Sequence, residues 1–187
     1  MKSLDAAILR ESFSAFVLRA FRQTHDQRLG PQPYVQHLCN EITKFIDGKT
    51  KRLLINLPPQ HLKTFVGSIC LPAYLLGKNP RLRIILTAYN DTLAEDLCEK
   101  IREMMKSAWY KQVFASRIKG GHSRTNDFAT EETVASMRYP RQALSRDAPP
   151  MSLSTTIHTK SAIGTMSGSS LWCGTILTHS SRGSATR

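Results

Sequence analysis

The sequence predicts an α/β fold in which a parallel sheet is preceded by helices. Two short apolar runs, 51–57 and 81–89, have the length and the flanking residues of buried strands. Each run is followed by a segment with helical apolar spacing, and this alternation is typical of a parallel α/β sheet. With 187 residues and 41% hydrophobic content, the chain is large enough for one domain of ordinary size.

Residues 1–48 are predicted to be an N-terminal helical region. A first helix over 3–23 has Ser3 as its N-cap, and its apolar residues fall on one face that we expect to turn to the core. A second helix over 33–47 ends at Gly48, which is a common helix-terminating position for glycine. The apolar face of the first helix consists of Leu4, Ile8, Phe13, Phe16, Val17 and Phe21.

Residues 49–130 carry the predicted sheet. The strand over 51–57 leads through a turn into a helix over 64–76, which Pro72 should bend. The strand over 81–89 leads into a helix capped by Asn90 or Asp91, and the aromatic stretch 107–114 is partly helical.

The turn after the first strand has the layout of a phosphate-binding loop. Lys63 and Thr64 stand between an apolar strand and an apolar helix, where a lysine can bind phosphate and a hydroxyl can ligate Mg²⁺. The turn contains no glycine, although glycine usually makes such a loop possible. An ordinary turn with a solvated lysine is an equally good interpretation of these residues alone.

The segment "RLLINLPPQHLKT" resembles the first nucleotide-binding motif of phage terminase large subunits, the motors that pump DNA into viral capsids. That family has an apolar strand followed by Pro-Pro-x-His-Gly-Lys and then Ser or Thr. This chain matches at Pro58, Pro59, His61, Lys63 and Thr64. The likeness continues in order through 72–105, 109–114 and 126–130, so that it covers about residues 30 to 130.

The resemblance implies an incomplete RecA-like P-loop ATPase core, with ATP and Mg²⁺ as cofactors. Lys63 would hold the β- and γ-phosphates, Thr64 would ligate Mg²⁺, and Gln60 and His61 would lie along the phosphates. For His61 the alternative is a loop histidine packed on the end of the strand. The family also implies double-stranded DNA, the phage portal and the small terminase subunit as partners, and a nuclease domain of the ribonuclease H type.

Leu62 departs from the family, which has glycine before the lysine. A leucine side chain there would crowd the phosphates or force the loop open, so we expect weak nucleotide binding or none. The family also requires a second motif, an apolar strand that ends in two acidic residues, and residues 131–187 do not provide it. We therefore assign no catalytic residue, and whether the chain is an enzyme stays open.

Residues 131–187 are predicted to be a disordered or out-of-frame tail. From residue 151 onward 16 of 37 residues are Ser or Thr, and no acidic residue follows Asp147. Reading the third base of each codon with the first two bases of the next permits an apolar strand followed by an Asp-Asp pair. A frameshift near 130–133 explains this, and a true Ser/Thr-rich tail is the alternative.

The formal net charge of +12 favours polyanionic partners, so a non-catalytic basic nucleic-acid-binding module is the alternative function. A third possibility is a fragment that does not fold stably, because it holds only part of a larger sheet. The four cysteines show no zinc spacing and indicate reduced thiols in a cytoplasmic protein. The resemblance to terminases implies a bacterial host or a prophage as the source of the gene. We find no apolar run that could span a membrane.

Overall fold

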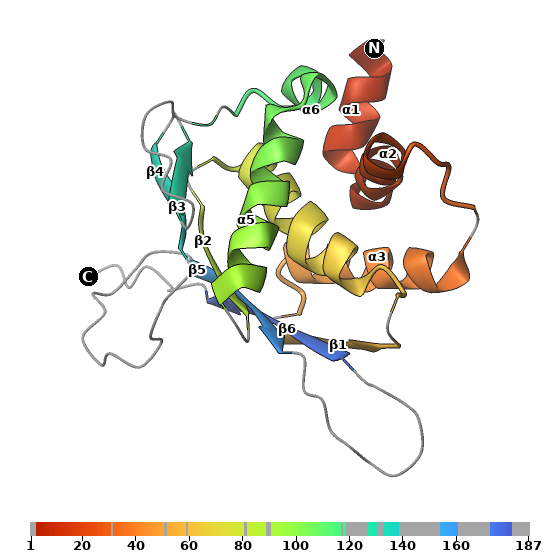
Figure 1. The fold of residues 1–187 in the computed structure, drawn as a ribbon. Helices are drawn as coiled ribbons and strands as arrows, with labels where there is room; N and C mark the ends of the chain where they lie inside the picture. The colour runs from red at the N-terminus through yellow and green to blue at the C-terminus, as the bar shows by residue number, and fades with distance from the viewer. Residues whose placement is uncertain are drawn as a thin grey trace, which may run out of the picture.

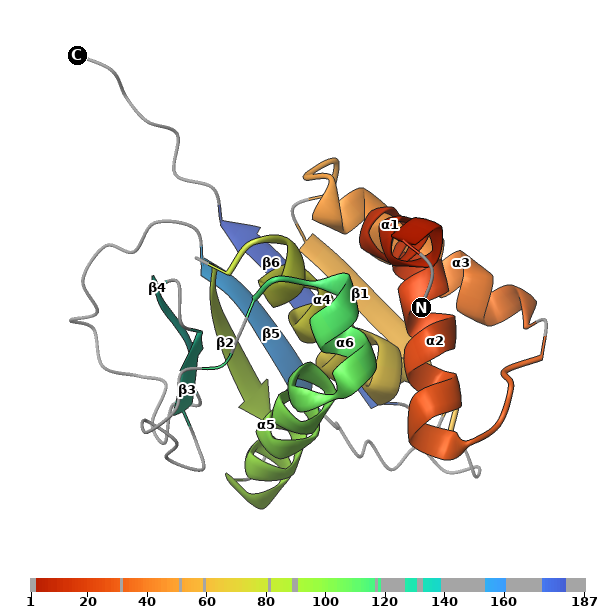
Figure 2. The same ribbon diagram turned by 90° about the horizontal axis from the view of Figure 1, so that it is seen from above.

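The protein has a layer of helices packed on one face of a sheet (Figure 1). The same arrangement seen from above shows α5 and α6 beside α2, with the sheet behind them (Figure 2). The computed structural model describes residues 3–30, 32–50, 52–58, 60–80, 82–88, 91–116, 118, 127–130, 133–138, 154–160 and 173–180.

Two helices, α1 (Ser3–Glu11) and α2 (Phe13–His25), replace the single N-terminal helix that periodicity predicts. The chain breaks at Ser12, whose backbone is extended, with φ −107° and ψ 110°. The Ser12 hydroxyl accepts a hydrogen bond from the backbone N–H of Ala15 at 3.3 Å. Ser12 is therefore the N-cap of α2, and a serine hydroxyl in this role stabilises a new helix start.

Helix α3 (Pro33–Ile46) lies where the sequence predicts it. It begins with proline, which lacks an N–H group that a first helical turn would leave without a partner. It ends before Gly48, whose φ of 74° is in the left-handed region that glycine adopts without strain. Strand β1 (Arg52–Leu57) follows directly.

The helix after β1 starts in a widened form. A π-helical segment, η1 (Phe65–Cys70), continues without interruption into α4 (Leu71–Lys78). The N–H of Leu71 donates to the carbonyl of Val66, five residues back. Pro72 explains this widening, because its ring would clash with the carbonyl four residues earlier in an ordinary α-helix. The proline is thus accompanied by a change of helical form, and the predicted bend stays a prediction.

Strand β2 (Arg83–Ala88) belongs to the sheet. Helices α5 (Asp91–Lys106) and α6 (Ala108–Val113) complete the helical layer. All three lie where the sequence predicts a strand, a helix and a partly helical aromatic stretch. Within the part of the chain that the structure describes, no helix is long and apolar enough to cross a membrane.

The sheet is mixed, with the strand order β1-β6-β5-β2-β4-β3. β2 pairs in parallel with β4 and β5, whereas β1–β6, β5–β6 and β3–β4 are antiparallel. Three of these strands lie within residues 131–187, and the out-of-frame origin of that segment stays a prediction, as does the RecA-like core. The later strands are β3 (Asp127–Thr130), β4 (Thr133–Arg138), β5 (Ser154–Lys160) and β6 (Cys173–Ser180).

An aromatic cluster joins the N-terminal helices to α4 and α6. The Phe16 ring lies 5.3 Å from that of Tyr74 and 5.4 Å from that of Trp109, measured between centroids. The hydroxyl of Tyr74 donates to the carbonyl of Arg10 at 2.6 Å, and the hydroxyl of Tyr110 donates to that of Ala73 at 2.7 Å. The N-terminal helices therefore share one hydrophobic core with the elements that follow the loop.

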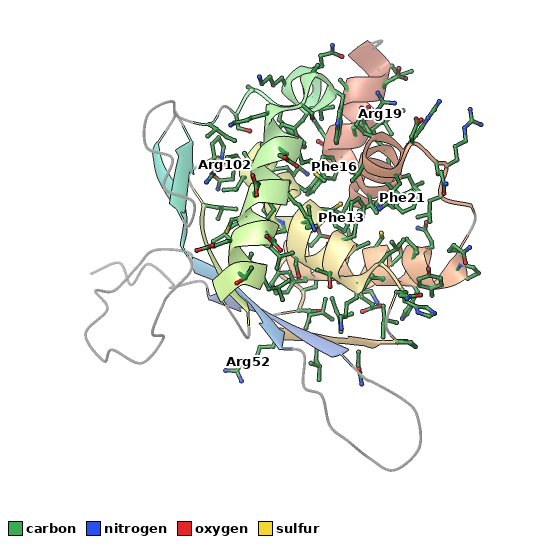
Figure 3. All side chains as sticks on the ribbon, in the orientation of Figure 1. Phe13, Phe16, Arg19, Phe21, Arg52 and Arg102 are labelled. Carbon is green, nitrogen blue, oxygen red and sulfur yellow. The ribbon has the colours of Figure 1, made fainter. Side chains whose placement is uncertain are left out.

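The opposite face of β1 is open. Ile55 is buried toward the helices, whereas Leu54 on the other face is 66% exposed. Arg52 also points away from the helical layer (Figure 3). Among the described residues no helix covers this face of the sheet.

Candidate phosphate-binding site

The loop between β1 and η1 ends in the first turn of a helix. The N–H of Val66 donates to the carbonyl of Leu62 at 2.8 Å, so helical hydrogen bonding begins at Leu62. The N–H groups of Lys63, Thr64 and Phe65 therefore lie in the first turn, where a helix offers them no acceptor of its own. Such a helix start favours a negative charge.

Two non-glycine residues of the loop have left-handed backbones, Gln60 with φ 65° and Leu62 with φ 56°. This conformation costs an ordinary L-residue about 1–2 kcal/mol, but it is free of strain for glycine. Leu62 thus has the backbone geometry that explains why a glycine would serve at this place. The loop keeps this turn even though the residue that fits it best is missing.

The Leu62 side chain is half-buried and packs against the hydrophobic core. Contact with the core offsets part of the backbone strain, because each buried apolar group contributes favourably. The leucine is thus held by packing beneath the loop as well as by its neighbours in the chain. Whether it weakens phosphate binding stays a prediction.

Lys63 and Thr64 differ in exposure. Lys63 is only 5% exposed, and its side chain lies within the protein, whereas Thr64 is exposed at the head of the helix. His61 is half-buried, with its ring centroid 5.2 Å from that of Tyr34 in α3. The Tyr34 contact attaches the loop to the N-terminal helices, a connection that the sequence did not reveal.

Two of the remaining predicted residues lie on the outer part of the loop. Pro58 and Gln60 are exposed, and Pro59 lies outside the described residues. The loop therefore presents backbone and polar groups at its outer surface, beyond the end of β1. The predicted positions are contiguous in the structure, from the end of the strand to the head of the helix.

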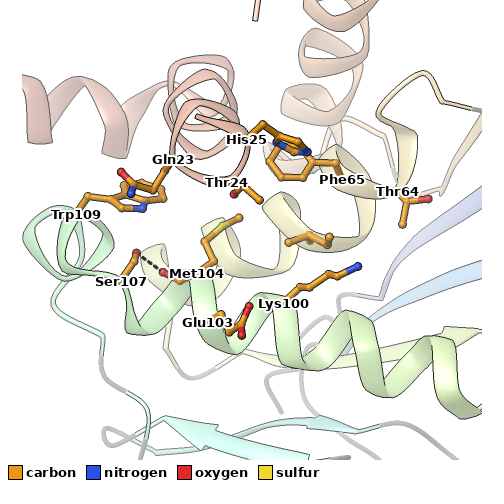
Figure 4. Close-up of a pocket in the computed structure, with 11 residues that line it drawn as sticks. Gln23, Thr24, His25, Thr64, Phe65, Lys100, Glu103, Met104, Ser107 and Trp109 are labelled. Carbon is orange, nitrogen blue, oxygen red and sulfur yellow. Dashed lines mark hydrogen bonds between the residues drawn. The ribbon is translucent and has the colours of Figure 1, made fainter. Parts of the chain in front are cut away.

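A cavity of about 670 Å³ adjoins the head of the helix. It lies between the end of α2, the start of η1, the second half of α5 and the start of α6 (Figure 4). Thr64 is the residue that the cavity shares with the predicted loop. The volume is in the range of small-molecule sites, which is roughly 300–1,000 Å³.

The cavity has an apolar floor and a polar rim. The floor contains Phe65, Ile69, Met104 and Trp109. On the rim, the His25 ring stacks on Phe21 at 4.3 Å and meets the edge of the Phe65 ring at 5.4 Å. The other rim residues are Gln23, Thr24, Thr64, Lys100, Glu103 and Ser107.

Sequence reasoning missed this cavity because its walls come from separate helices. The sequence singled out Thr64 and the aromatic stretch that contains Trp109, but spacing along the chain could not place the two beside each other. In the sequence, Lys100 and Glu103 are two of several charged residues on the polar side of an amphipathic helix, and nothing in the pattern distinguishes them from the others.

Two buried thiols lie behind the loop. Cys70 is in η1 and Cys39 is in α3, and both side chains are almost fully buried. Burial raises the pKa of Cys39 to about 11 and that of Cys70 well above its usual value. Because the thiolate is the reactive form, burial disfavours nucleophilic chemistry at both cysteines.

No family model, curated protein or solved structure matches the chain. Its function is therefore argued from its own residues. Within the described segments, no group of three or more His, Cys, Asp or Glu side chains could hold a metal ion. Thr64, the residue that the sequence predicts as a ligand of Mg²⁺, is exposed at the head of the helix.

Proposed function

We propose that this chain is the N-terminal ATPase part of a phage terminase large subunit, weak or inactive in ATP hydrolysis. The observation that carries the proposal is the left-handed backbone of Leu62 directly before Lys63 and Thr64. A strained conformation at a non-glycine residue persists only where the surrounding structure enforces it. Such strain is concentrated at functional sites, and here it falls at the position that the terminase motif gives to glycine.

The loop residues have defined roles in this proposal. Lys63 supplies positive charge to the β- and γ-phosphates, and Thr64 supplies a hydroxyl ligand to Mg²⁺. The first-turn N–H groups donate to phosphate oxygens. Pro58, Pro59, Gln60 and His61 shape the loop and lie along the phosphates.

Hydrolysis also requires a carboxylate that handles Mg²⁺ and the attacking water. The predicted second motif, an apolar strand ending in two acidic residues, is missing from the amino-acid sequence after residue 130. Nucleotide binding can therefore persist without efficient turnover, since binding uses the loop and turnover uses the missing acids.

Calorimetric titration with Mg-ATP tests the proposal. The chain should bind ATP weakly or not at all, and Leu62→Gly should bind it more tightly. In the Leu62→Gly protein, Lys63→Ala should weaken binding about tenfold or more, because a charge-assisted contact is lost. Lys106→Ala is the matched control, since this lysine is exposed at the end of α5 and distant from the loop in sequence. Equal affinities for the Lys63 and Lys106 variants would refute the proposal.

A basic nucleic-acid-binding module is the second candidate, and the net charge of +12 favours it. Its affinity for double-stranded DNA should fall steeply as salt rises, because lysine and arginine contacts release counterions. It should not depend on ATP or on Lys63. DNA binding that remains equal in the parent and in Lys63→Ala, together with no ATP binding, would select this candidate.

The terminase proposal also specifies a setting. The partners are double-stranded DNA, the phage portal and the small terminase subunit, and the compartment is the cytoplasm of a bacterial host. A pull-down with purified portal and small subunit, with and without Mg-ATP, tests these partners. Absence of both contacts in the presence of nucleotide would argue against the packaging role.

A further inference from the structure

The cavity beside the loop contains a second positive charge. Lys100, in the middle of α5, lines the cavity together with Thr64, although the two residues are far apart in sequence. Figure 4 shows the ammonium end of Lys100 directed toward the Thr64 end of the cavity. The lysine therefore faces the place where a phosphate group would meet the head of the helix.

Lys100 makes no ion pair within the described part of the chain. The salt bridges there involve Lys44, Lys49 and Lys78 instead. A lysine ammonium is a compact charge on a flexible stem, so it can reach a phosphate without moving the backbone. Lys100 can therefore contact a phosphate without first giving up an ion pair to another described residue.

One acidic residue faces the same cavity. Glu103 is one helical turn after Lys100 and also lines it. A carboxylate near a bound phosphate is repulsive, so Glu103 opposes the effect of Lys100. Removing the charge of Lys100 should therefore weaken the binding of a polyphosphate, and removing the charge of Glu103 should strengthen it.

We infer that Lys100 is a second phosphate-binding residue, which contacts the polyphosphate of a nucleotide from the side of the cavity while Lys63 acts from the loop. This inference rests on the proposed nucleotide site. It adds a cation from α5 to a site whose other groups all come from the turn after β1.

The experiment compares Lys100→Met with Lys106→Met, a change of the same type on the same helix outside the cavity lining. Trp109 lines the cavity and serves as a fluorescence reporter once Trp172, the other tryptophan, is replaced by Phe. The probes are Mg-ATP, inorganic tripolyphosphate and adenosine. They are titrated into the full chain with and without Leu62→Gly.

Lys100→Met should weaken ATP and tripolyphosphate binding about tenfold and leave adenosine binding unchanged, as expected for loss of one close charge. Lys106→Met should bind as the parent does. Glu103→Gln should bind tripolyphosphate more tightly, whereas Glu99→Gln, outside the cavity lining on the same helix, should not.

If Lys63→Ala abolishes ATP binding while Lys100→Met equals Lys106→Met, the role of Lys100 is refuted and the proposed function stands. If Lys100→Met weakens tripolyphosphate binding while Lys63→Ala does not, the cavity binds phosphate independently and the proposed loop function is refuted. If the chain binds neither Mg-ATP nor tripolyphosphate, with or without Leu62→Gly, both the role of Lys100 and the proposed function are refuted.

Discussion

Replacing Leu62 by alanine or by glycine separates the backbone strain of the loop from the packing of its side chain. Both changes remove the half-buried leucine and its contact with the core, which is worth about 1 kcal/mol for a side chain buried to this degree. Only glycine also relieves the left-handed backbone at φ 56°. We therefore expect the Leu62→Gly protein to be more stable than the Leu62→Ala protein by about 1 kcal/mol.

The order is opposite at an ordinary helical position, where alanine is better than glycine by about 1 kcal/mol. Glu99, exposed in the middle of α5, provides that reference through its own alanine and glycine variants. Gly48 provides a second reference, since its φ is 74° and a Cβ there would meet no atom within 4 Å. Gly48→Ala should therefore be less stable than the parent by about 1 kcal/mol for conformational reasons alone.

Urea unfolding followed by circular dichroism measures these differences in unfolding free energy. The variants are compared with one shared m value, the dependence of the unfolding free energy on urea concentration. The reasoning is refuted if Leu62→Ala is as stable as Leu62→Gly or more so while the Glu99 pair behaves as a normal helix. In that case the left-handed turn before Lys63 is absent from the folded protein. The structural support for a phosphate loop would be lost with it.

Three further predictions concern the core and the reading frame. Gly77→Ala should destabilise the fold by about 1 kcal/mol despite the better helix propensity of alanine, because the new Cβ would lie 2.6–2.8 Å from the Phe114 ring; a more stable variant in urea would contradict this. Tyr74→Phe should cost about 1 kcal/mol at neutral pH through loss of the bond to Arg10. Burial raises the pKa of Tyr74 from 10 to about 12, so the parent should lose its stability advantage over Tyr74→Phe as the pH rises from 10 to 12. A difference in unfolding free energy that stays constant over this pH range would contradict the prediction. The DNA downstream of codon 133, read in the alternative frame, should stay open and encode an apolar strand ending in Asp-Asp, whereas early stop codons would exclude a frameshift.

Hydrophobic periodicity predicted α3 and α5, because each buries one regular apolar face, and short apolar runs predicted β1 and β2. The expectation that β1 is buried was wrong for one of its faces, where Leu54 is 66% exposed. Periodicity did not predict the break at Ser12, since the apolar spacing continues across that residue and its role depends on a hydroxyl contact with Ala15. The π-helical start of the loop helix was also missed. It depends on wider hydrogen bonding before Pro72, in which the N–H of Leu71 donates to the carbonyl of Val66.

The loop residues could be predicted as a set because they are contiguous, and the strand–turn–helix context is visible in the sequence. The left-handed backbone of Leu62 could not be predicted from propensity, since leucine disfavours it. Lys100 was missed for a different reason. Its approach to Thr64 follows from how α5 packs beside η1, and no spacing along the chain encodes that packing.

The N-terminal helices are part of the surroundings of the loop. Tyr34 of α3 contacts His61, and the end of α2 forms one wall of the cavity that Thr64 and Lys100 share. Phe16 ties α2 to α4 and α6, so the position of this wall is fixed by the same aromatic core that supports the helix after the loop. The surroundings of the proposed phosphate site therefore include residues before β1 as well as the loop. A segment beginning at β1 would retain Lys63 and Thr64 but would lack both Tyr34 and the α2 wall.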